Sequence, residues 1–249
     1  MNESYVVITG ACGGIGQALC KAFTDEGFKV IATDQKDSPV EGLQFDTYVK
    51  TSLERTVSDS DYAQDTFNTI NQAMKGKPMH ALINNAAVQI LGGVDSLSVS
   101  DWRQTLDVNL IAPFMWTQAF ISALERDQGS VINISSIHAR LTKKNFIAYA
   151  TSKAALSGMT RALAIDVGER VRVNAIEPAA IETEMLMAGF KDNPGGYEDL
   201  KNFHPIARIG RTEEVARLAV FLASESVGFT HGSCISVDGA IGARLFDPV

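Results

Sequence analysis

Thr9-Gly10-Ala11-Cys12-Gly13-Gly14-Ile15-Gly16 follows an apolar run over residues 5–9 and leads into a segment, 16–26, whose apolar residues have helical spacing. Glycines at such a junction allow a tight turn and the approach of a pyrophosphate, which the first N–H groups of a helix attract. The stretch therefore predicts a strand, a phosphate-binding turn and a helix. Residue 19 is not glycine, so the spacing departs from the usual dinucleotide fingerprint. The turn residues expected to contact a dinucleotide are Gly10, Cys12, Gly13, Gly14, Ile15 and Gly16.

Asp34 ends the next predicted strand, 28–33, and lies 18 residues after Gly16. An acidic residue about 20 residues beyond the glycine turn typically accepts hydrogen bonds from the adenosine ribose. The same carboxylate would repel a 2′-phosphate, and Gly13 offers no basic side chain, so we expect NAD(H) rather than NADP(H). Lys36 could reverse this preference, because it could reach a phosphate from the following turn.

Short β-rich runs alternate with longer runs of helical spacing along the chain. This alternation is typical of βαβ units, in which helices cover both faces of a parallel sheet. We predict one α/β domain over residues 1–249, since no linker or repeat divides the chain. The least regular segment, 181–211, is the expected substrate lid. Strands are predicted at 5–9, 28–33, 42–49, 80–84, 130–134, 171–176 and 234–237, and helices at 16–26, 62–74, 101–126, 149–167 and 213–223.

The composition excludes several classes of protein. Of the 249 residues 45% are apolar, enough for a sizeable core, yet no apolar stretch reaches the ~18 residues that a membrane span needs. A net charge of −7 argues against nucleic-acid binding, and the first residues lack the features of a secretory signal. Cys12, Cys20 and Cys234 have no metal-like spacing, so we expect reduced thiols, no metal site and a cytoplasmic protein.

Ser136, Tyr149 and Lys153 form the candidate catalytic group. Tyr149 and Lys153 are four residues apart and share one face of a helix, while Ser136 ends the strand-like run before it. An ammonium near a phenol lowers the phenol pKa, which makes tyrosine a general acid/base near neutral pH, and a serine hydroxyl can hold a substrate oxygen. These groups suit the interconversion of an alcohol and a ketone with a hydride carrier. A second pair with the same spacing, Tyr197 and Lys201, has no serine partner and is expected on the surface.

Further motifs follow in order along the chain. Asn84-Asn85-Ala86-Ala87 ends a predicted strand, Asp107-Val108-Asn109-Leu110 lies in a predicted helix, and Asn174-Ala175-Ile176-Glu177-Pro178-Ala179 ends a later strand. Together with the glycine turn and the serine, tyrosine and lysine, they resemble the motifs of the short-chain dehydrogenase/reductase family over nearly the whole chain. The resemblance implies a Rossmann-like, doubly wound sheet of about seven mostly parallel strands and an NAD(P)-dependent oxidoreductase.

The resemblance also implies a role for each matching residue. Tyr149 would donate or remove the alcohol proton, Lys153 would bind the nicotinamide ribose and tune Tyr149, and Ser136 would orient the carbonyl. Asn109 would hold a water that links Lys153 to solvent. Asp46 would contact the adenine. The other cofactor contacts would come from Asn85, Ala86, Pro178, Ile181 and Thr183.

Two residues depart from the family pattern. Ala87 and Ala179 stand where the family usually has glycine. If the backbone there has a positive φ, an alanine would be strained. The departures concern the local cofactor geometry and not the class of reaction, because all four catalytic positions are filled.

Family members are commonly tetramers or dimers, so the resemblance implies a homo-oligomer. The contact between subunits would use the two long helices predicted at 101–126 and 149–167. Phe114, Met115, Trp116 and Phe120 supply apolar bulk for it. The alternative is that these side chains face only their own sheet.

The substrate contacts are expected from Gln89, Ser136, His138 and Arg140, whose side chains suit a polar molecule. We therefore predict NAD(H)-dependent interconversion of a secondary alcohol and a ketone on a small sugar, polyol or hydroxy acid. Two alternatives stay open. One is the reduction of a 3-oxoacyl thioester by NADPH, and the other is a dinucleotide-binding regulator or scaffold without catalysis.

Overall fold

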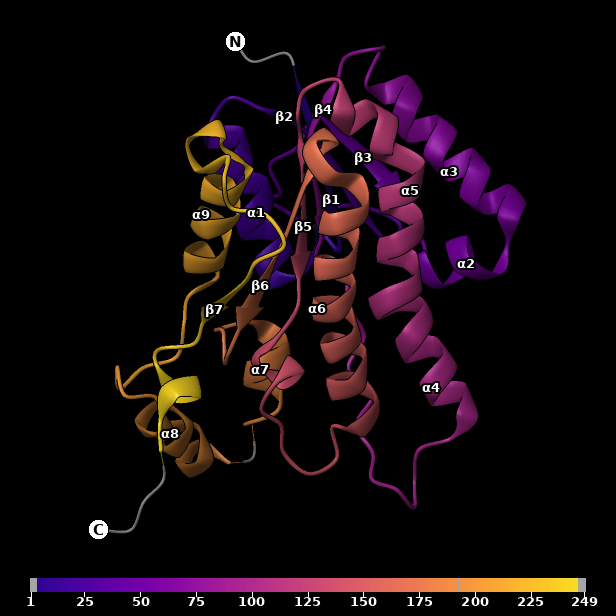
Figure 1. Ribbon diagram of the computed structural model, residues 1–249. Helices are drawn as coiled ribbons and strands as arrows, with labels where there is room; N and C mark the ends of the chain where they lie inside the picture. Colours follow the sequence, from indigo (N-terminus) through magenta and orange to yellow (C-terminus); the bar gives the residue numbers. More distant parts are fainter. Residues whose placement is uncertain (1–3, 192, 246–249) are drawn as a thin grey trace.

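The computed structural model describes residues 4–191 and 193–245, which form a seven-stranded parallel sheet with helices around it (Figure 1). The strands lie in the order β3-β2-β1-β4-β5-β6-β7, which confirms the predicted α/β class and strand number. The strands are β1 Tyr5–Thr9, β2 Lys29–Asp34, β3 Thr47–Lys50, β4 Met79–Asn84, β5 Ser130–Ile134, β6 Arg172–Pro178 and β7 Cys234–Val237. The α-helices are α1 Gly14–Asp25, α2 Leu53–Ser58, α3 Ser60–Ala73, α4 Val99–Leu106, α5 Ala112–Glu125, α6 Ile147–Val167, α7 Glu184–Ala188, α8 Pro194–Phe203 and α9 Thr212–Ala223. Shorter turns are η1 Asp107–Ile111, η2 Ile137–Ala139, η3 Gly168–Arg170, η4 Glu225–Val227 and η5 Ile241–Ala243.

The strand order sets the place where a ligand can bind. From β1 the chain winds outward through β2 and β3, and it then returns to β4, which pairs with β1 on the other side. Ligands of doubly wound sheets bind beyond the carboxyl ends of the strands, where the winding direction reverses. The glycine turn after β1 and the 84–87 motif at the end of β4 therefore lie at this crevice.

Helices cover both faces of the sheet, as the alternation predicts. On one face α1 and α9 pack together, and their Phe23 and Leu222 join the same buried cluster. On the other face α3, α5 and α6 contribute Ile70, Trp116 and Ala164 to a second cluster. Figure 1 shows α1 and α9 on the opposite side of the strands from α3 and α5. Alternate residues of the strands enter the two clusters, so the sheet is buried on both faces.

The helix predicted at 101–126 is interrupted. It consists of α4, one turn of π-helix (η1) and α5. Ser98 begins α4 with a capping box in which its side chain accepts from Asp101 N and the Asp101 carboxylate accepts from Ser98 N. The helix was predicted to start at Asp101, two residues after its observed start at Val99. Pro113 lies in the first turn of α5, where its missing N–H costs little.

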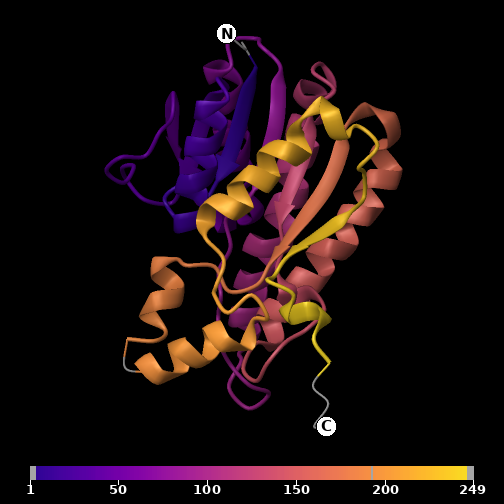
Figure 2. The same ribbon diagram turned by 90° about the vertical axis from the view of Figure 1, so that its left-hand side faces the viewer.

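The segment predicted as an irregular lid contains two helices, α7 and α8. Thr183 and Asn193 begin them, since each side chain accepts a hydrogen bond from a backbone N–H three residues later. The five residues of α7 are too few to show a helical period, and α8 carries Gly195 and Gly196 in its first turn, which weakens its helical pattern in the sequence. Figure 2 shows α7 and α8 as a unit beyond one end of the sheet.

The region around the third strand also differs from the prediction. The strand β3 covers four residues instead of 42–49, and the short helix α2 follows it. Six residues are too few to show helical periodicity, although Ser52, whose side chain accepts from Arg55 N, is a recognisable N-cap.

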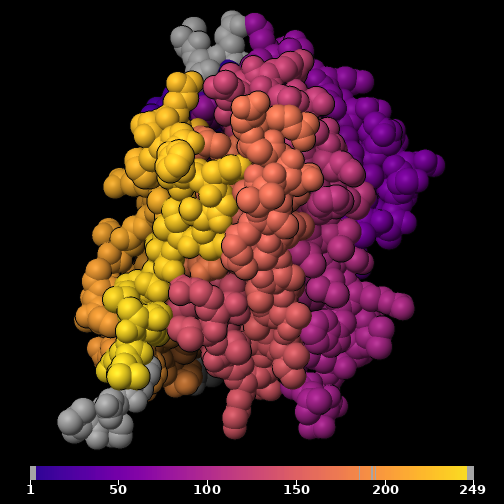
Figure 3. All heavy atoms as spheres, in the orientation of Figure 1, coloured from indigo at the N-terminus to yellow at the C-terminus, as the bar shows by residue number. Residues whose placement is uncertain are grey.

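The last strand, β7, lies at the edge of the sheet next to α6, and Figure 3 shows the C-terminal part of the chain on the surface beside this helix. Arg161 of α6 donates to the Cys234 sulfur at 3.6 Å. Over residues 4–191 and 193–245, no helix is both long and apolar enough to cross a membrane. The same residues contain no group of three or more His, Cys, Asp or Glu side chains that could hold a metal ion.

Candidate active site

The glycine turn is shaped for close approach of a ligand. Gly10 has a φ of +64°, and a Cβ atom there would lie 2.7 Å from the Cα of Ala86. A Cβ on Gly16 would clash with the carbonyl oxygen of Gly10. Gly13 is the N-cap of α1 and has no side chain to bond to the first turn, so the first N–H groups of this helix have no side-chain cap. These features fit a dinucleotide pyrophosphate.

The carboxylate of Asp34 lies beside this turn, at the carboxyl end of β2. One of its oxygens accepts a hydrogen bond from Cys12 N at 3.0 Å, and the other accepts from Lys36 N at 3.2 Å. The backbone therefore fixes the carboxylate at the position predicted for a ribose contact. The neighbouring Asp37 forms an ion pair with Lys50, so one acidic and one basic side chain lie together near Asp34.

Asp46 does not lie at this edge, and its predicted contact with the adenine is wrong. It stands just before β3, where its carboxylate accepts from Val30 N at 2.9 Å and from Lys29 Nζ at 2.7 Å. These are contacts at the beginning of β2, whereas a dinucleotide binds at the carboxyl ends of the strands. The residue that follows the carboxyl end of β3 is Thr51. The strand was predicted at 42–49, but β3 begins only at Thr47, so Asp46 precedes the strand.

Asn85 and Ala86 pack against the glycine turn. Thr9 Oγ1 accepts from the backbone N–H groups of both residues, at 3.0 and 3.1 Å. The Asn85 amide donates to the carbonyls of Thr9 and Gly10, at 2.9 and 3.0 Å. These bonds tie the loop after β4 to the loop after β1, so the two sides of the crevice form one rigid wall.

The two alanines that replace glycines are not strained. Within residues 4–191 and 193–245, the non-glycine residues with positive φ are Lys75, Gln128, Asn145, Ala207 and Ala240. Ala87 and Ala179 are absent from this set, so each adopts a backbone conformation open to any residue. Ala179 N also donates to the carbonyl of Val237 at 3.0 Å, which holds the end of β6 against β7.

Lys153 is 2% exposed and lies on the face of α6 that meets β5. Its Nζ donates to the carbonyl oxygen of Ile134 at 2.7 Å and stands 5.7 Å from the centre of the Tyr149 ring. Burial lowers the pKa of this ammonium to about 7. The lysine is therefore held near the phenol in a state that readily loses its proton.

Tyr149 differs from the prediction of a lowered pKa. Burial raises the pKa of its phenol above the usual value, and a hydrogen bond with Ser136 opposes this rise. Because burial also disfavours the charged lysine, the expected ammonium–phenolate attraction is weak in this structure. The phenol is thus held in its protonated form, ready to donate to an oxygen beside Ser136.

Asn109 lies in the π-helical turn η1 and is fully buried. Its amide oxygen accepts from Val88 N at 2.8 Å, and its Nδ2 donates to the carbonyl of Val88 at 2.9 Å and to Ser152 Oγ at 3.0 Å. The interruption of the helix turns this side chain inward. Single π-helical turns are frequent at functional sites.

His138 forms part of the wall beside the tyrosine. Its ring stacks on Phe146 with centroids 4.5 Å apart, and it meets the Tyr149 ring edge-on at 5.7 Å. Its backbone N–H donates to Ser136 Oγ at 3.2 Å. Burial, followed by the charge of Lys143, lowers the pKa of His138 to about 4, so the imidazole is neutral at pH 7.

Arg140, which we predicted to contact a substrate carboxylate, pairs with a carboxylate of the protein itself. Its Nε donates to the buried carboxylate of Glu177 at 2.9 Å, and its Nη2 donates to Ser236. Ser157 also donates to Glu177, at 2.8 Å. The guanidinium therefore neutralises a buried charge behind α6.

Gln89 is exposed on the loop after β4. Gly92 N donates to the carbonyl of Asn145 at 2.8 Å, which brings this loop to the segment that carries Phe146. Gln89 and His138 therefore belong to loops that meet at the same rim.

The last predicted cofactor residues follow β6. Pro178 ends this strand, Ile181 is buried and bridged to Gly210, and Thr183 begins α7. A Cβ placed on Gly14 would lie 3.1 Å from Cγ2 of Thr183, so the first residues of the segment 181–211 pack directly on the glycine turn.

Comparisons with known proteins agree with this arrangement. The family model described as Enoyl-(Acyl carrier protein) reductase matches residues 10–241. An uncharacterized oxidoreductase of Thermotoga maritima is 33% identical over 242 residues, which cover 94% of this chain and 95% of the relative. The chain belongs to the short-chain dehydrogenase/reductase family.

Solved structures of this family superpose closely on the chain. The ligand-free aldohexose dehydrogenase of Thermoplasma acidophilum has a TM-score of 0.90 at 31% identity, covering 99% of this chain and 96% of that one. A 4-hydroxyisoleucine dehydrogenase complexed with NADH has a TM-score of 0.86 at 28% identity, covering 97% and 100%. A putative gluconate 5-dehydrogenase of Beutenbergia cavernae, with bound NADP at low occupancy, has a TM-score of 0.85 at 29% identity, covering 97% of each chain. The dehydrogenase/reductase family thus supports a nicotinamide dinucleotide as cofactor.

The sequence analysis did not single out Phe146, whose ring contacts that of Tyr149, or Glu177, a buried acid that pairs with Arg140. Phe146 supports His138, and it could have been suspected as an aromatic residue three positions before Tyr149. The buried Glu177 was read only as a variable position of the motif that ends at Ala179. A charged residue inside an apolar strand was the available signal, because such groups are buried only when paired.

Proposed function

We propose that this protein is an NAD(H)-dependent oxidoreductase that interconverts a secondary alcohol and a ketone on a small polar substrate. The observation that carries the proposal is the position of the Tyr149 phenol, hydrogen-bonded to Ser136 and beside Lys153 at the carboxyl end of the sheet. Proton transfer to a carbonyl oxygen needs a donor and an orienting group on the same oxygen. Tyr149 and Ser136 supply these two groups.

In the reducing direction, Ser136 Oγ would orient the carbonyl oxygen while the Tyr149 hydroxyl donates its proton to that oxygen. A bound nicotinamide would supply the hydride for the carbon. The developing phenolate would be stabilised by Lys153, which gains a proton more readily near such a charge. Asn109 would hold the helix break and the loop at Val88 in place.

The preference for NAD(H) rests on Asp34. Its carboxylate is anchored by Cys12 N at the edge of the glycine turn, where it can accept hydrogen bonds from ribose hydroxyls and repel a 2′-phosphate. Lys36 is exposed nearby, and its side chain is the group that could favour NADP(H).

The polar side chains close to Tyr149 support a polar substrate. His138 is neutral and can donate and accept hydrogen bonds, and Gln89 lies on the adjoining loop. Arg140 is engaged with Glu177, so a substrate carboxylate at this point receives no support from it. A sugar or polyol therefore suits the wall better than an acid.

The test is a comparison of wild type with Tyr149→Phe. We expect NADH binding, followed by protein fluorescence, to be retained within a few fold, and turnover of sugars, polyols and hydroxy acids to fall at least 100-fold, as for loss of a general acid. Turnover close to wild type would refute the assignment of Tyr149. Loss of both binding and turnover would indicate misfolding, which circular dichroism would reveal.

The reduction of a 3-oxoacyl thioester is the second candidate, because a relative from Cupriavidus necator that is 30% identical over 251 residues is described as an acetoacetyl-CoA reductase. Acetoacetyl-CoA belongs in the same substrate panel. Turnover of this thioester with NADPH, and none of the polar alcohols with NAD, would replace the first proposal.

A further inference from the structure

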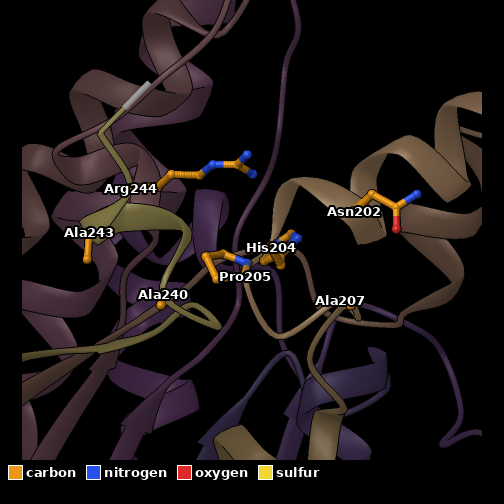
Figure 4. Close-up of a pocket in the computed structure, with 7 residues that line it drawn as sticks. All are labelled: Asn202, His204, Pro205, Ala207, Ala240, Ala243 and Arg244. Atoms are coloured by element: carbon orange, nitrogen blue, oxygen red, sulfur yellow. The ribbon is translucent and has the colours of Figure 1, made fainter. Parts of the chain in front are cut away.

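A chain of buried polar side chains adjoins one of the cavities of this protein. The larger cavity, of about 500 Å³, lies between the end of α8 and the turn η5, and Figure 4 shows the residues that line it. The proposed catalytic residues are not among them. A smaller cavity, of about 180 Å³, lies between α6 and the strands β6 and β7, and its wall includes Arg140, Ser157 and Glu177. These three residues belong to the chain, which leads from this cavity to the active site.

Glu177 lies at the outer end of the chain. Its buried carboxylate accepts hydrogen bonds from Arg140 Nε at 2.9 Å and from Ser157 Oγ at 2.8 Å. Ser157 Oγ also lies 2.8 Å from Ser135 Oγ. A carboxylate paired with a guanidinium only accepts, and a hydroxyl has one hydrogen, so Ser157 donates to Glu177 and Ser135 donates to Ser157. The buried charge therefore sets the direction of both hydrogen bonds.

Ser135 connects the chain to the active site, because it directly precedes Ser136. Its hydroxyl also lies 3.0 Å from the backbone carbonyl oxygen of Lys153, so its hydrogen is shared between two acceptors. Lys153 Nζ donates in turn to the carbonyl of Ile134, the residue before Ser135. The end of β5 therefore contacts the lysine both at its backbone and at its ammonium.

The chain holds β5, α6 and β6 together at one point. Ser157 lies one helical turn after Lys153, so both side chains point from α6 toward the end of β5. The phenol of Tyr149 also comes from α6, whereas Ser136 follows β5. For both groups to reach one substrate oxygen, the helix must stay at a fixed distance from the end of the strand, and small displacements of reacting groups lower the rate strongly.

We propose that Ser157 and Glu177 are positioning residues of the active site. Through Ser135 they hold the end of β5 against α6, and this keeps Ser136 and the contacts of Lys153 in the arrangement that proton transfer requires. The inference rests on the proposed function, since the two residues are assigned an effect on that reaction.

Two variants interrupt the chain at different points. Ser157→Ala removes the central hydroxyl, leaves the pair of Arg140 with Glu177 in place and changes no charge. Glu177→Gln removes the charge at the outer end. Thr160→Val is the matched control, because Thr160 is also buried on α6 and its Oγ1 accepts from Asn133 Nδ2 of β5 at 2.9 Å, outside the chain.

The first measurement is the titration of Lys153, followed by NMR of its ε-methylene group and assigned with Lys153→Met. Burial holds the pKa of this amine at about 7. A looser contact between β5 and α6 admits water, so in Ser157→Ala the midpoint should rise by about one pH unit. It should stay unchanged in Thr160→Val. This readout needs no substrate.

The second measurement is turnover of the sugar, polyol and hydroxy-acid panel. In Ser157→Ala and Glu177→Gln we expect kcat to fall at least fivefold, with KM and NADH binding within twofold of wild type, because the groups that bind are intact and only their alignment changes. Thr160→Val should keep the wild-type kcat. If Glu177→Gln does not fold, Ser157→Ala, which keeps the buried ion pair, decides alone.

An unchanged Lys153 midpoint in Ser157→Ala would overturn the proposal, whatever the activity. A wild-type kcat in Ser157→Ala, or equal changes in Thr160→Val, would also overturn it, because the effect would then be absent or merely one of stability. A raised midpoint in a protein whose wild type turns over no member of the panel would refute the proposed function and support the role of the chain in holding Lys153.

Discussion

At the scale of single residues, the Asp34 carboxylate determines the choice of cofactor in our proposal. Replacing Asp34 by Asn keeps the shape and removes the charge that repels a 2′-phosphate. We expect about tenfold weaker NADH binding, since hydrogen bonds to a charged group are worth roughly 1.5–3 kcal/mol, together with a gain in NADPH binding. Fluorescence titration with both cofactors measures this. Asp37→Asn is the matched control, and an unchanged NADH-to-NADPH ratio in Asp34→Asn would contradict the assignment.

Lys153 makes stability depend on pH in a defined direction. Its pKa is about 7 in the folded protein, against 10.5 for an unperturbed lysine, so between these values the unfolded chain binds the proton and the folded chain does not. Stability therefore falls as pH decreases from 10.5 to about 7, by at most about 1.4 kcal/mol per pH unit, and levels off below. Relative to wild type, Lys153→Met should gain stability as pH falls through this window. Urea unfolding at several pH values measures this, with the exposed Lys144→Met as control; parallel curves for Lys153→Met and wild type would contradict the low pKa.

At the scale of elements, the π-helical turn η1 joins two helices to the loop after β4 through one side chain. Asn109→Ala would leave the N–H and C=O of Val88 without their partners inside the fold. We expect a loss of about 2–4 kcal/mol in the free energy of unfolding, together with a loss of activity. Chemical denaturation measures the loss, and Asn68→Ala, on the exposed face of α3, is the control. Equal effects of the two substitutions would mean that η1 needs no anchor.

The elements of the fold also show how much of the structure can be predicted from the sequence. The strands β1 and β5 were predicted with their observed bounds, because an apolar run between turn residues defines a buried strand. The turn η1 was missed because helical periodicity continues across it, and only the contacts of Asn109 with Val88 and Ser152 explain it. Motif spacing was enough to predict that Ser136, Tyr149 and Lys153 lie close together. The direction of Arg140 was not, because it depends on Glu177, a residue 37 positions away.

At the scale of the whole molecule, the helices α5 and α6 and the turn η1 leave several large apolar side chains exposed. Trp116 and Phe120 are fully buried against their own sheet, which corrects their predicted place in a subunit contact. Phe114 is 40% exposed on the same helix, next to Ile111 at 38%, and Ile147 at the start of α6 is 41% exposed. These three residues remain candidates for the contact between subunits.

We expect the protein to sediment as a dimer or tetramer and Phe114→Glu to lower its mass at micromolar concentration, since a charge in an apolar contact is costly. Phe221→Glu, a substitution of similar exposure on α9, should leave the mass unchanged. A monomeric wild type, or equal dissociation of both variants, would exclude this face as the contact.

The pairing of Arg140 with Glu177 constrains how this enzyme can diverge. Glu177 is 2% exposed, so loss of the arginine alone would strand a buried carboxylate at a cost of several kcal/mol. A lineage that replaces position 140 with a small or apolar residue must first, or at once, replace the acid at position 177. Among related sequences these two positions should therefore vary together.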